Sequence, residues 1–526
     1  MHIGKTPSAS YYCIITWICL VGSSIFTVSD TFMDTVSYPK WIITATLFII
    51  FIFFLLPYFV LSKGIYWRLT YKQICRYTNI LVLFETLIVI SKYAGLHILY
   101  HQCQAGTFNN VAGLVACLGV SFPIGFIFFR EYHIYECILF VITKFLSFLV
   151  LVICGSRIGC ICIIILTILI CFENYRYKKH FAIILGIISI LFCTCFLKTP
   201  STMGRWFIVE RTMELILQRP FLGWGDGGFT REYMNVQADY FAAHSESQYE
   251  ILADNIHHPL NEFLLIAVNY GLLCLFITIF MCLGVFLYYK FHKTSYGKEG
   301  CLVFLSIIVI ASFSYPLSYP FTWLMLTLSI VLVFSTAISH IKSRSSIVLF
   351  VMTLLIADSF TFVYLKNELD FQLSWKRVAQ NMHMQPFEEI KKTYDALYQC
   401  KHSNYHFLYD YACEAYDKEQ YELALRLSKE TEKFIADYEL EMLIGDCYQS
   451  LDSVDQAIQS YQYAHYMCPS RLMPLYETYN IYSSLNDTLK CRRLYYQIIH
   501  KDIKVRNHIT EIIQKEINQD FKRFLN

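Results

Sequence analysis

The segment HHPLNE at residues 257–262 combines residue types that could catalyse a transfer reaction, and an apolar run follows it directly. Imidazole titrates near neutral pH, so a histidine here could take a proton from a hydroxyl group. His257 and His258 are both candidates for this general base or for orienting an acceptor, although a histidine where a helix begins can also be purely structural.

Asp254, His258 and Glu262 are four residues apart in sequence. In a continuous helix all three would lie on one face and could bind a metal ion. Pro259 fits the first turn of a helix but would break a helix that already runs through Asp254. We therefore expect neither a metal nor a cofactor, and a metal site on this helix face is the alternative.

Two arginines could bind an anionic group. Arg157 lies at the start of one apolar run, and Arg205 follows soon after the end of the next run. A guanidinium remains charged at any working pH and offers a planar fork that suits phosphate or pyrophosphate. Each arginine taken singly could instead extend toward lipid headgroups.

The sequence GWGDGG at 223–228 formally satisfies the glycine pattern of dinucleotide-binding sites. No strand precedes it and no βαβ unit could contain it, so we predict a tight turn at Gly223 and Gly225 instead. The preceding stretch 205–218 is predicted to be an amphipathic helix whose apolar side lies on the membrane surface. The residues on that side would be Phe207, Ile208, Leu215 and Ile216.

The rest of the chain must position these groups, and its composition is that of a membrane protein. Of 526 residues, 56% are hydrophobic and only 16% are charged, which predicts a polytopic helical bundle. The net charge is +2, and no basic stripe with interleaved aromatic residues indicates a nucleic-acid partner. Most cysteines lie inside apolar runs without ligand spacing and are expected to be small buried residues.

Apolar runs of roughly 17 to 25 residues predict membrane-spanning helices. Eleven such runs lie near residues 11–28, 41–62, 77–97, 111–129, 134–154, 158–173, 180–197, 263–289, 301–317, 321–340 and 346–364. With the N-terminus in the cytoplasm, the cytoplasmic loops hold fourteen lysines and arginines, and the short loops on the other side hold two. This excess predicts that the long loop and the C-terminal region are extracytoplasmic.

Glu85 and Lys144 fall inside predicted spans, where ionisable side chains often line a transport pathway. This makes a transporter the main alternative to an enzyme, although no inverted repeat or pair of broken helices is visible. A mutual ion pair between the two residues would explain them equally well.

The C-terminal region, residues 366–526, is polar and has the spacing of a tetratricopeptide repeat. The matching positions are Gly445, Tyr448, Ala457, Tyr461, Ala464 and Pro469. Small residues would let two helices approach, aromatic rings would fill the layer between them, and proline would end the second helix. Weaker copies lie near Ala412 and Tyr482, and Cys447 and Cys491 should be buried in the repeat cores. Such a domain binds a protein partner or serves as a scaffold.

Together the motifs resemble the O-antigen ligase and polymerase superfamily. They are Gly155-Ser156-Arg157, Gly204-Arg205, Pro220 with Gly223-Trp224-Gly225, His258 to Leu264, and Asn269-Tyr270-Gly271. The motifs cover roughly residues 150–270, and the topology covers residues 1–365. The tail also resembles the tetratricopeptide extension of Bacteroidetes members of the superfamily.

The resemblance implies an all-α protein: a membrane bundle of about 11–12 helices with C-type glycosyltransferase architecture over residues 1–365, and a tetratricopeptide-like domain over 366–526. The catalytic loop would lie at about 198–260 on the periplasmic side of the bacterial inner membrane. The enzyme would be an inverting, metal-independent glycosyltransferase. It would move a glycan from undecaprenyl pyrophosphate to a hydroxyl acceptor on lipid A core, another glycan or a protein.

Carried to this sequence, the resemblance implies that Arg157 and Arg205 bind the pyrophosphate and that His258 is the base. Asn261 and Glu262 would orient the acceptor, the turn at Gly223 and Gly225 would border the substrate, and His257 competes with His258 for the catalytic role. Ligase, polymerase and protein O-oligosaccharyltransferase all share these motifs. A membrane anchor that only displays the repeats is the third class of function, and the arginine and histidine motifs argue against it.

The charge asymmetry predicts the side of the membrane on which the C-terminal region lies. Alkaline phosphatase fused after Lys366 in a bacterial host should be active, and a green fluorescent protein at the same site should remain dark. The reverse pattern would place this region in the cytoplasm and make the span count wrong.

Overall fold

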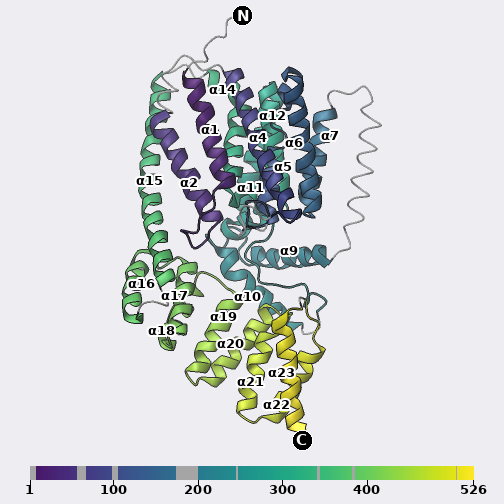
Figure 1. Cartoon of the computed structure of the whole chain (residues 1–526), viewed down its shortest axis with the longest axis vertical. Coiled ribbons are helices and arrows are strands. Elements are labelled where there is room, and N and C mark those ends of the chain that lie inside the picture. Colours follow the sequence, from purple (N-terminus) through teal and green to yellow (C-terminus); the bar gives the residue numbers. More distant parts are fainter. Residues whose placement is uncertain are drawn as a thin grey trace, which may run out of the picture. The chain divides into compact units, whose positions relative to one another are not determined.

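The computed structural model describes residues 8–55, 67–96, 103, 105–172, 200–244, 247–340, 344–381, 386–504 and 506–525. The described residues form helices and no strand, as expected for a helical membrane protein (Figure 1). The chain divides into two compact units. The first unit comprises residues 1–193, 260–262 and 278–380, and the second comprises residues 194–259, 263–277 and 381–526.

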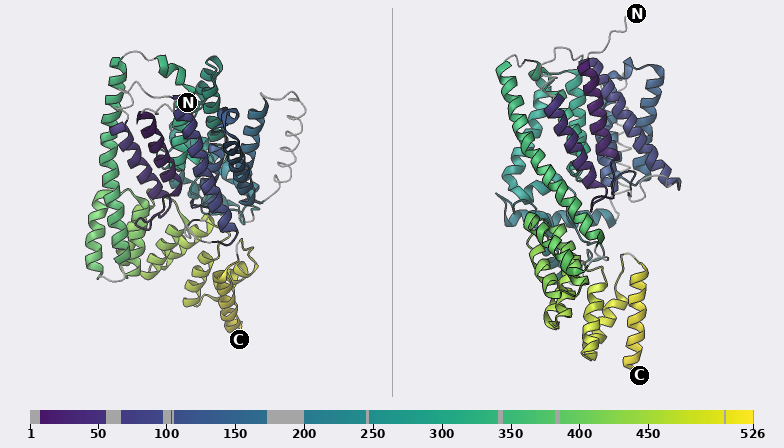
Figure 2. Two further views of the ribbon diagram at one scale, coloured as in Figure 1. Left: turned by 45° about the horizontal axis from the view of Figure 1, so that its top comes forward. Right: turned by 60° about the vertical axis from the view of Figure 1, so that its left-hand side comes forward.

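The first unit is a bundle of mostly apolar helices that run side by side (Figures 1 and 2). Its helices are α1 (Ser8–Phe26), α2 (Ser37–Ile50), α4 (Trp67–Tyr93), α5 (Val111–Ser121), α6 (Ile134–Ile153), α7 (Arg157–Phe172), α12 (Ser295–Ala311), α13 (Pro320–Val333), α14 (Ser335–His340) and α15 (Arg344–Asn381). A π-helical turn (Phe51–Leu55) continues α2, and short 3-10 helices lie at Phe126–Glu131 and Pro316–Ser318.

The helices agree with the predicted spans only in part. Among the described residues, three helices are long and apolar enough to cross a membrane: α4, α6 and α11 (Glu262–Phe291). Helices α1, α2, α5, α7 and α13 are apolar but shorter. The predicted span 180–197 lies outside the described residues. The apolar helices support a membrane protein, and the number eleven stays a prediction.

Glu85 and Lys144 do not form the predicted mutual ion pair. The carboxylate of Glu85 accepts hydrogen bonds from the backbone N–H and the hydroxyl of Thr107, each at 2.9 Å. The ammonium of Lys144 donates to the Ser121 carbonyl oxygen at 3.1 Å and lies 5.1 Å from the centre of the Phe140 ring. The explanation by a mutual pair was wrong because each group is satisfied by neighbours from other segments.

The second unit combines α9 (Pro200–Gln218), α10 (Gly228–Ala243) and the first half of α11 with the C-terminal helices. These are α16 (Phe387–Lys401), α17 (Tyr405–Asp417), α18 (Tyr421–Thr431), α19 (Tyr438–Ser450), α20 (Val454–Met467), α21 (Met473–Ser484), α22 (Thr488–His500) and α23 (His508–Leu525). Figure 1 shows α19 and α20, and then α21 and α22, as neighbouring pairs.

The C-terminal helix pairs recur at a regular spacing. The turn inside each pair contains one residue with positive φ: Glu419 between α17 and α18, Asp452 between α19 and α20, and Asn486 between α21 and α22. These residues are 33 and 34 positions apart. At the middle pair a side chain on Gly445 would come within 2.5 Å of the Tyr461 ring, so the two helices meet where the spacing predicted.

The predicted buried residues of the middle pair are in place. Ala457, Tyr461 and Ala464 are fully buried, and the predicted burial of Cys447 and Cys491 is confirmed. Within the membrane helices, Cys160 and Cys162 are also buried, as expected for cysteines that act as small apolar residues.

Candidate active site

The glycine-rich turn is inserted into a break in helix α11. In a continuous helix, the N–H of Leu272 would donate to the carbonyl of Val268. Here Leu272 donates to the Pro220 carbonyl at 2.7 Å, and the Val268 carbonyl accepts from Trp224 at 2.8 Å. The N–H of Gly225 adds a bond to the Asn269 carbonyl at 2.8 Å. The turn therefore satisfies the backbone groups that the break exposes.

Only glycine fits at the two contact points. Gly223 has φ +68°, and a side chain there would lie 2.6 Å from the carbonyl of Asn269. Gly271 has φ +80°, and a side chain there would run into the Phe221 carbonyl. Gly225 also has positive φ, but the space beside it is open. The predicted tight turn is thus confirmed, and it connects α9 to α10 without any strand.

Asn269 holds the beginning of α10. Its Oδ1 accepts a hydrogen bond from the N–H of Phe229 at 3.0 Å, and Asn269 itself is buried. The N–H groups of a first helical turn have no partner within the helix, so a side-chain acceptor from another segment stabilises them. The turn, α10 and α11 therefore form one fixed structure.

The predicted membrane-facing side of α9 was wrong. Phe207, Ile208, Leu215 and Ile216 are buried inside the second unit. Phe207 stacks on Tyr249 with 4.8 Å between ring centres and packs against Phe241 of α10. The exposed apolar residues lie on a different side of the helix and in the turn after it: Trp206, Met213, Leu217, Phe221 and Leu222.

The segment before α11 is irregular, and α11 begins only at Glu262. Asp254, His258 and Glu262 therefore do not stack on one helix face, so the geometry behind the alternative metal site was wrong. Across the described residues, no group of three histidine, cysteine or acidic side chains could hold a metal ion. The carboxylate of Asp254 instead accepts from Lys504 at 2.9 Å and from Arg471 at 3.3 Å.

His257 lies against the C-terminal helices. Its Nε2 is 3.2 Å from Oδ2 of Asp437, and Asn255 donates to the same oxygen at 2.7 Å. Asp437 also caps α19, because its Oδ1 accepts from the N–H groups of Glu439 and Leu440. Burial alone would raise the pKa of Asp437, but the hydrogen bonds from His257 and Asn255 keep it below the usual 3.8.

His258 has a different environment from its neighbour. Its Nε2 is shielded from solvent, whereas the His257 side chain is 45% exposed. After the buried Pro259, Leu260 adopts φ +55°, a left-handed conformation that costs a non-glycine residue about 1–2 kcal/mol. Such strain persists only where the surroundings impose it, and it is common at functional sites.

Asn261 and Glu262 fix the start of α11 to the segment between α12 and α13. Asn261 donates to the Ser312 carbonyl at 2.8 Å, and Glu262 accepts from the N–H of Leu317 at 3.0 Å. Glu262 is buried. These contacts show that both side chains position the backbone next to His258.

The two predicted arginines lie at different helix ends. Arg157 is the first residue of α7 and half-buried, and it follows Gly155, which has φ +66°, and Ser156. The partial positive charge of a helix N-terminus adds to the attraction of this guanidinium for an anion. Arg205 is exposed in the second turn of α9. Arg157 belongs to the first unit and Arg205 to the second.

Three residues that hold this loop were missed in the sequence: Asp437, Arg471 and Lys504. Each is more than 180 positions away from its loop partner. Arg471 also pairs with Glu439 and lies over the Tyr438 ring at 4.3 Å. All three lie in connections next to helices, where charged residues usually face solvent, so no sequence pattern distinguished them.

Residues 142–279 match the model of the O-antigen ligase family. The matched segment contains every predicted site residue, from Arg157 through Arg205 to His258 and Glu262. No curated protein matches the chain. The match supports the resemblance seen in the motifs, and with it a membrane-integral, glycosyltransferase-like function of the O-antigen ligase kind that acts on lipid-linked glycans.

The contacts to the C-terminal helices predict a local effect of Asp437→Asn. Asparagine is as good a helix cap as aspartate, so α19 should persist while the charge opposite His257 is lost. Removing a charge-assisted bond costs about 1.5–3 kcal/mol. Amides of residues 254–258 in the purified protein should therefore exchange hydrogen about ten to a hundred times faster.

Asp487→Asn is the matched control, because Asp487 caps α22 without touching the loop. The pKa of Asp254 is also lowered: burial alone would raise it, and the bonds from Lys504 and Asn255 outweigh that effect. Both carboxylates therefore stabilise the folded loop above pH 3.8 and lose this contribution as the pH falls through their lowered pKa values. Equal exchange in both variants would contradict the anchoring role.

Proposed function

We propose that the protein transfers a glycan from an undecaprenyl-pyrophosphate donor to a hydroxyl acceptor at the periplasmic face of the bacterial inner membrane. The observation that carries this proposal is the family match, because one matched segment contains Arg157, Arg205 and His258. The fixed backbone around His258 supports a catalytic position, since a base must be held within reach of the proton that it removes.

The proposed reaction is a direct displacement that inverts the anomeric carbon. The acceptor oxygen attacks this carbon, the bond to the pyrophosphate oxygen breaks, and His258 takes the proton of the hydroxyl group. Undecaprenyl pyrophosphate leaves with the bonding electrons. Arg157 and Arg205 stabilise the negative charge that develops on it, and one such donor is typically worth about 3–4 kcal/mol of barrier.

His257 and His258 take separate roles in this proposal. His257 holds the loop through Asp437, which leaves His258 as the base. Asn261 and Glu262 orient the acceptor from the fixed start of α11, and the turn at Gly223 and Gly225 borders the substrate. The open space beside Gly225 suits that position.

The remaining regions have supporting roles in the proposal. About 11–12 membrane helices of C-type architecture over residues 1–365 carry the donor. Helix α9 contacts the membrane surface through Trp206 and Leu217, and the turn after it through Leu222. The C-terminal helices form a tetratricopeptide-like domain in the periplasm. Their spacing of 33 and 34 residues supports this assignment, because that repeat has a period of 34.

Polymerisation of glycan repeat units and glycosylation of a protein use the same donor chemistry and are the nearest alternatives. A transporter is less favoured, because Glu85 and Lys144, the ionisable residues that suggested one, are each hydrogen-bonded to neighbouring groups inside the bundle. A pure membrane anchor for the helical repeats would not require the matched segment.

Substitutions should separate the anion-binding residues from the base. Arg157→Lys and Arg205→Lys keep the charge but lose the planar fork, so turnover should fall about tenfold or more, with weaker donor binding. His258→Ala should lower turnover about a hundredfold or more and leave donor binding nearly intact. Donor binding and turnover are measured on the same detergent-purified variants.

His257→Ala is the comparison for His258→Ala, and it should lose much less activity. The assignment is wrong if His257→Ala is the inactive variant, or if His258→Ala loses donor affinity as severely as Arg157→Ala.

A metal-independent mechanism makes a separate prediction. Because guanidinium groups rather than a divalent ion stabilise the leaving group, transfer by the purified protein should continue at the same rate in excess EDTA. If activity is lost and one particular divalent ion restores it, the roles given to the arginines and His258 must be revised.

A further inference from the structure

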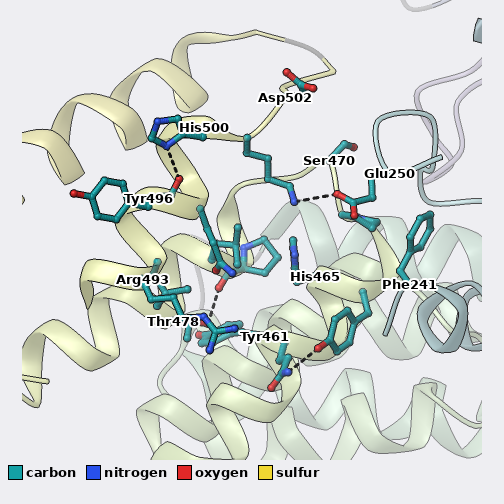
Figure 3. Close-up of a pocket in the computed structure, with 18 of the residues that line it drawn as sticks. Phe241, Glu250, Tyr461, His465, Ser470, Thr478, Arg493, Tyr496, His500 and Asp502 are labelled. Atoms are coloured by element: carbon teal, nitrogen blue, oxygen red, sulfur yellow. Dashed lines mark hydrogen bonds and ion pairs between the residues drawn. The ribbon is translucent and has the colours of Figure 1, made fainter. Parts of the chain in front are cut away.

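A cavity of 820 Å³ lies within the second unit, between the loop after α10 and the helices α20, α21 and α22. One wall is formed by Phe241 and by residues that precede His258 in the same loop: Ser247, Gln248, Glu250 and Ile251. Figure 3 shows His465 in the middle of the cavity, with Phe241 and Glu250 on one side and Tyr496 on the other. The volume is in the range of small-molecule sites, ~300–1,000 Å³.

His465 indicates that this cavity accepts a polar ligand. Its Nδ1 is buried and forms no hydrogen bond with any described residue. A buried polar atom without a partner costs free energy that a ligand can recover. Burial, together with the nearby Lys501, lowers the pKa of His465 to about 3, so the ring is neutral and can serve as a hydrogen-bond partner.

The rim of the cavity offers planar polar groups beside aromatic rings. Arg493 and Gln497 lie one helical turn apart on α22, and within the described part of the chain neither side chain is engaged in a hydrogen bond or ion pair. Tyr496 on the same helix also lines the cavity and is 45% exposed. Tyr466 and Tyr482 add further rings. A sugar ring presents C–H groups on its faces, which pack on aromatic rings, and hydroxyl groups at its edges, which bond to planar side chains.

The charges of the cavity disfavour a strongly anionic ligand. Lys501 is paired with Glu250 at 3.7 Å, and Lys490 is paired with Asp487 at 3.4 Å. Arg493 and the carboxylate of Asp502 also line the cavity, so the lining carries charges of both signs. A neutral or weakly acidic ligand fits this balance.

The lining also fits a glycan better than a peptide. Two common modes of peptide recognition are strand addition at the edge of a sheet and docking of a helix in an apolar groove. The walls here are helices and one loop, and the apolar residues Phe241, Leu475 and Leu494 are buried beneath the polar rim.

We propose that this cavity binds the acceptor as a short oligosaccharide and thereby holds it beside the loop that carries His258. This inference rests on the proposed function and names the acceptor class for it. Ile251 in the cavity wall precedes His258 by seven residues, so acceptor binding and the position of the base depend on the same loop.

The test measures binding to the full-length protein in detergent. The probe is the water-soluble oligosaccharide that mild acid releases from the lipopolysaccharide of the bacterium that makes this protein. A pool of random heptapeptides serves as the comparison. Arg493→Gln and Tyr496→Ala should each raise the Kd for the oligosaccharide about tenfold, which is the loss expected for one good contact. Arg426→Gln is the control, because exposed Arg426 on α18 does not line the cavity.

Transfer kinetics distinguish this inference from the proposed function. If both hold, Arg493→Gln raises the KM for the acceptor and leaves kcat and the KM for the donor unchanged. Active variants with an unchanged acceptor KM overturn the cavity assignment and leave the function standing. If the wild-type protein binds the oligosaccharide but shows no transfer activity, and the variants lose this binding, the cavity assignment is supported and the proposed function is overturned. If the wild-type protein binds the heptapeptides and not the oligosaccharide, and the variants lose the heptapeptide binding, the cavity assignment is overturned.

Discussion

The arrangement of the site depends on one close approach between two backbones. The turn at residues 220–225 takes the hydrogen-bonding places that the break in α11 leaves open, and this is possible only because Gly223 and Gly271 have no side chains. The contact determines where α9 ends, and through Asn269 it determines where α10 begins. The loop from α10 to α11 therefore starts and ends on a fixed frame, although it has no regular structure itself.

Charged contacts hold the middle of this loop. Asp254 and Asp437 are carboxylates with lowered pKa, each bound by at least two partners, and together they join the loop to α19, α21 and the segment before α23. Half-buried pairs of this kind are more specific than exposed ion pairs, because breaking one leaves a partly desolvated charge. His257 is occupied in this network, and the backbone is strained at Leu260, two residues after His258. The same loop thus separates an anchoring histidine from a candidate base.

The parts that sequence predicted are those fixed by local pattern. Apolar runs predicted α4, α6 and α11, and the spacing of small and aromatic residues predicted the contact of Gly445 with Tyr461. The errors concern tertiary contacts. Which side of α9 is covered depends on Phe241 and Tyr249, which pack on Phe207 from later segments.

The candidate site shows the same division. Residue types and motif spacing selected His258 and the glycine-rich turn, and the family match covers both. The partners Arg471 and Lys504 are surface-type residues more than 200 positions from Asp254, so their role follows only from the fold. Because these two residues flank the helices that line the cavity, a ligand bound there rests on the same elements that hold the loop. Under the proposed function, acceptor recognition and the placement of His258 therefore depend on the same elements of the second unit.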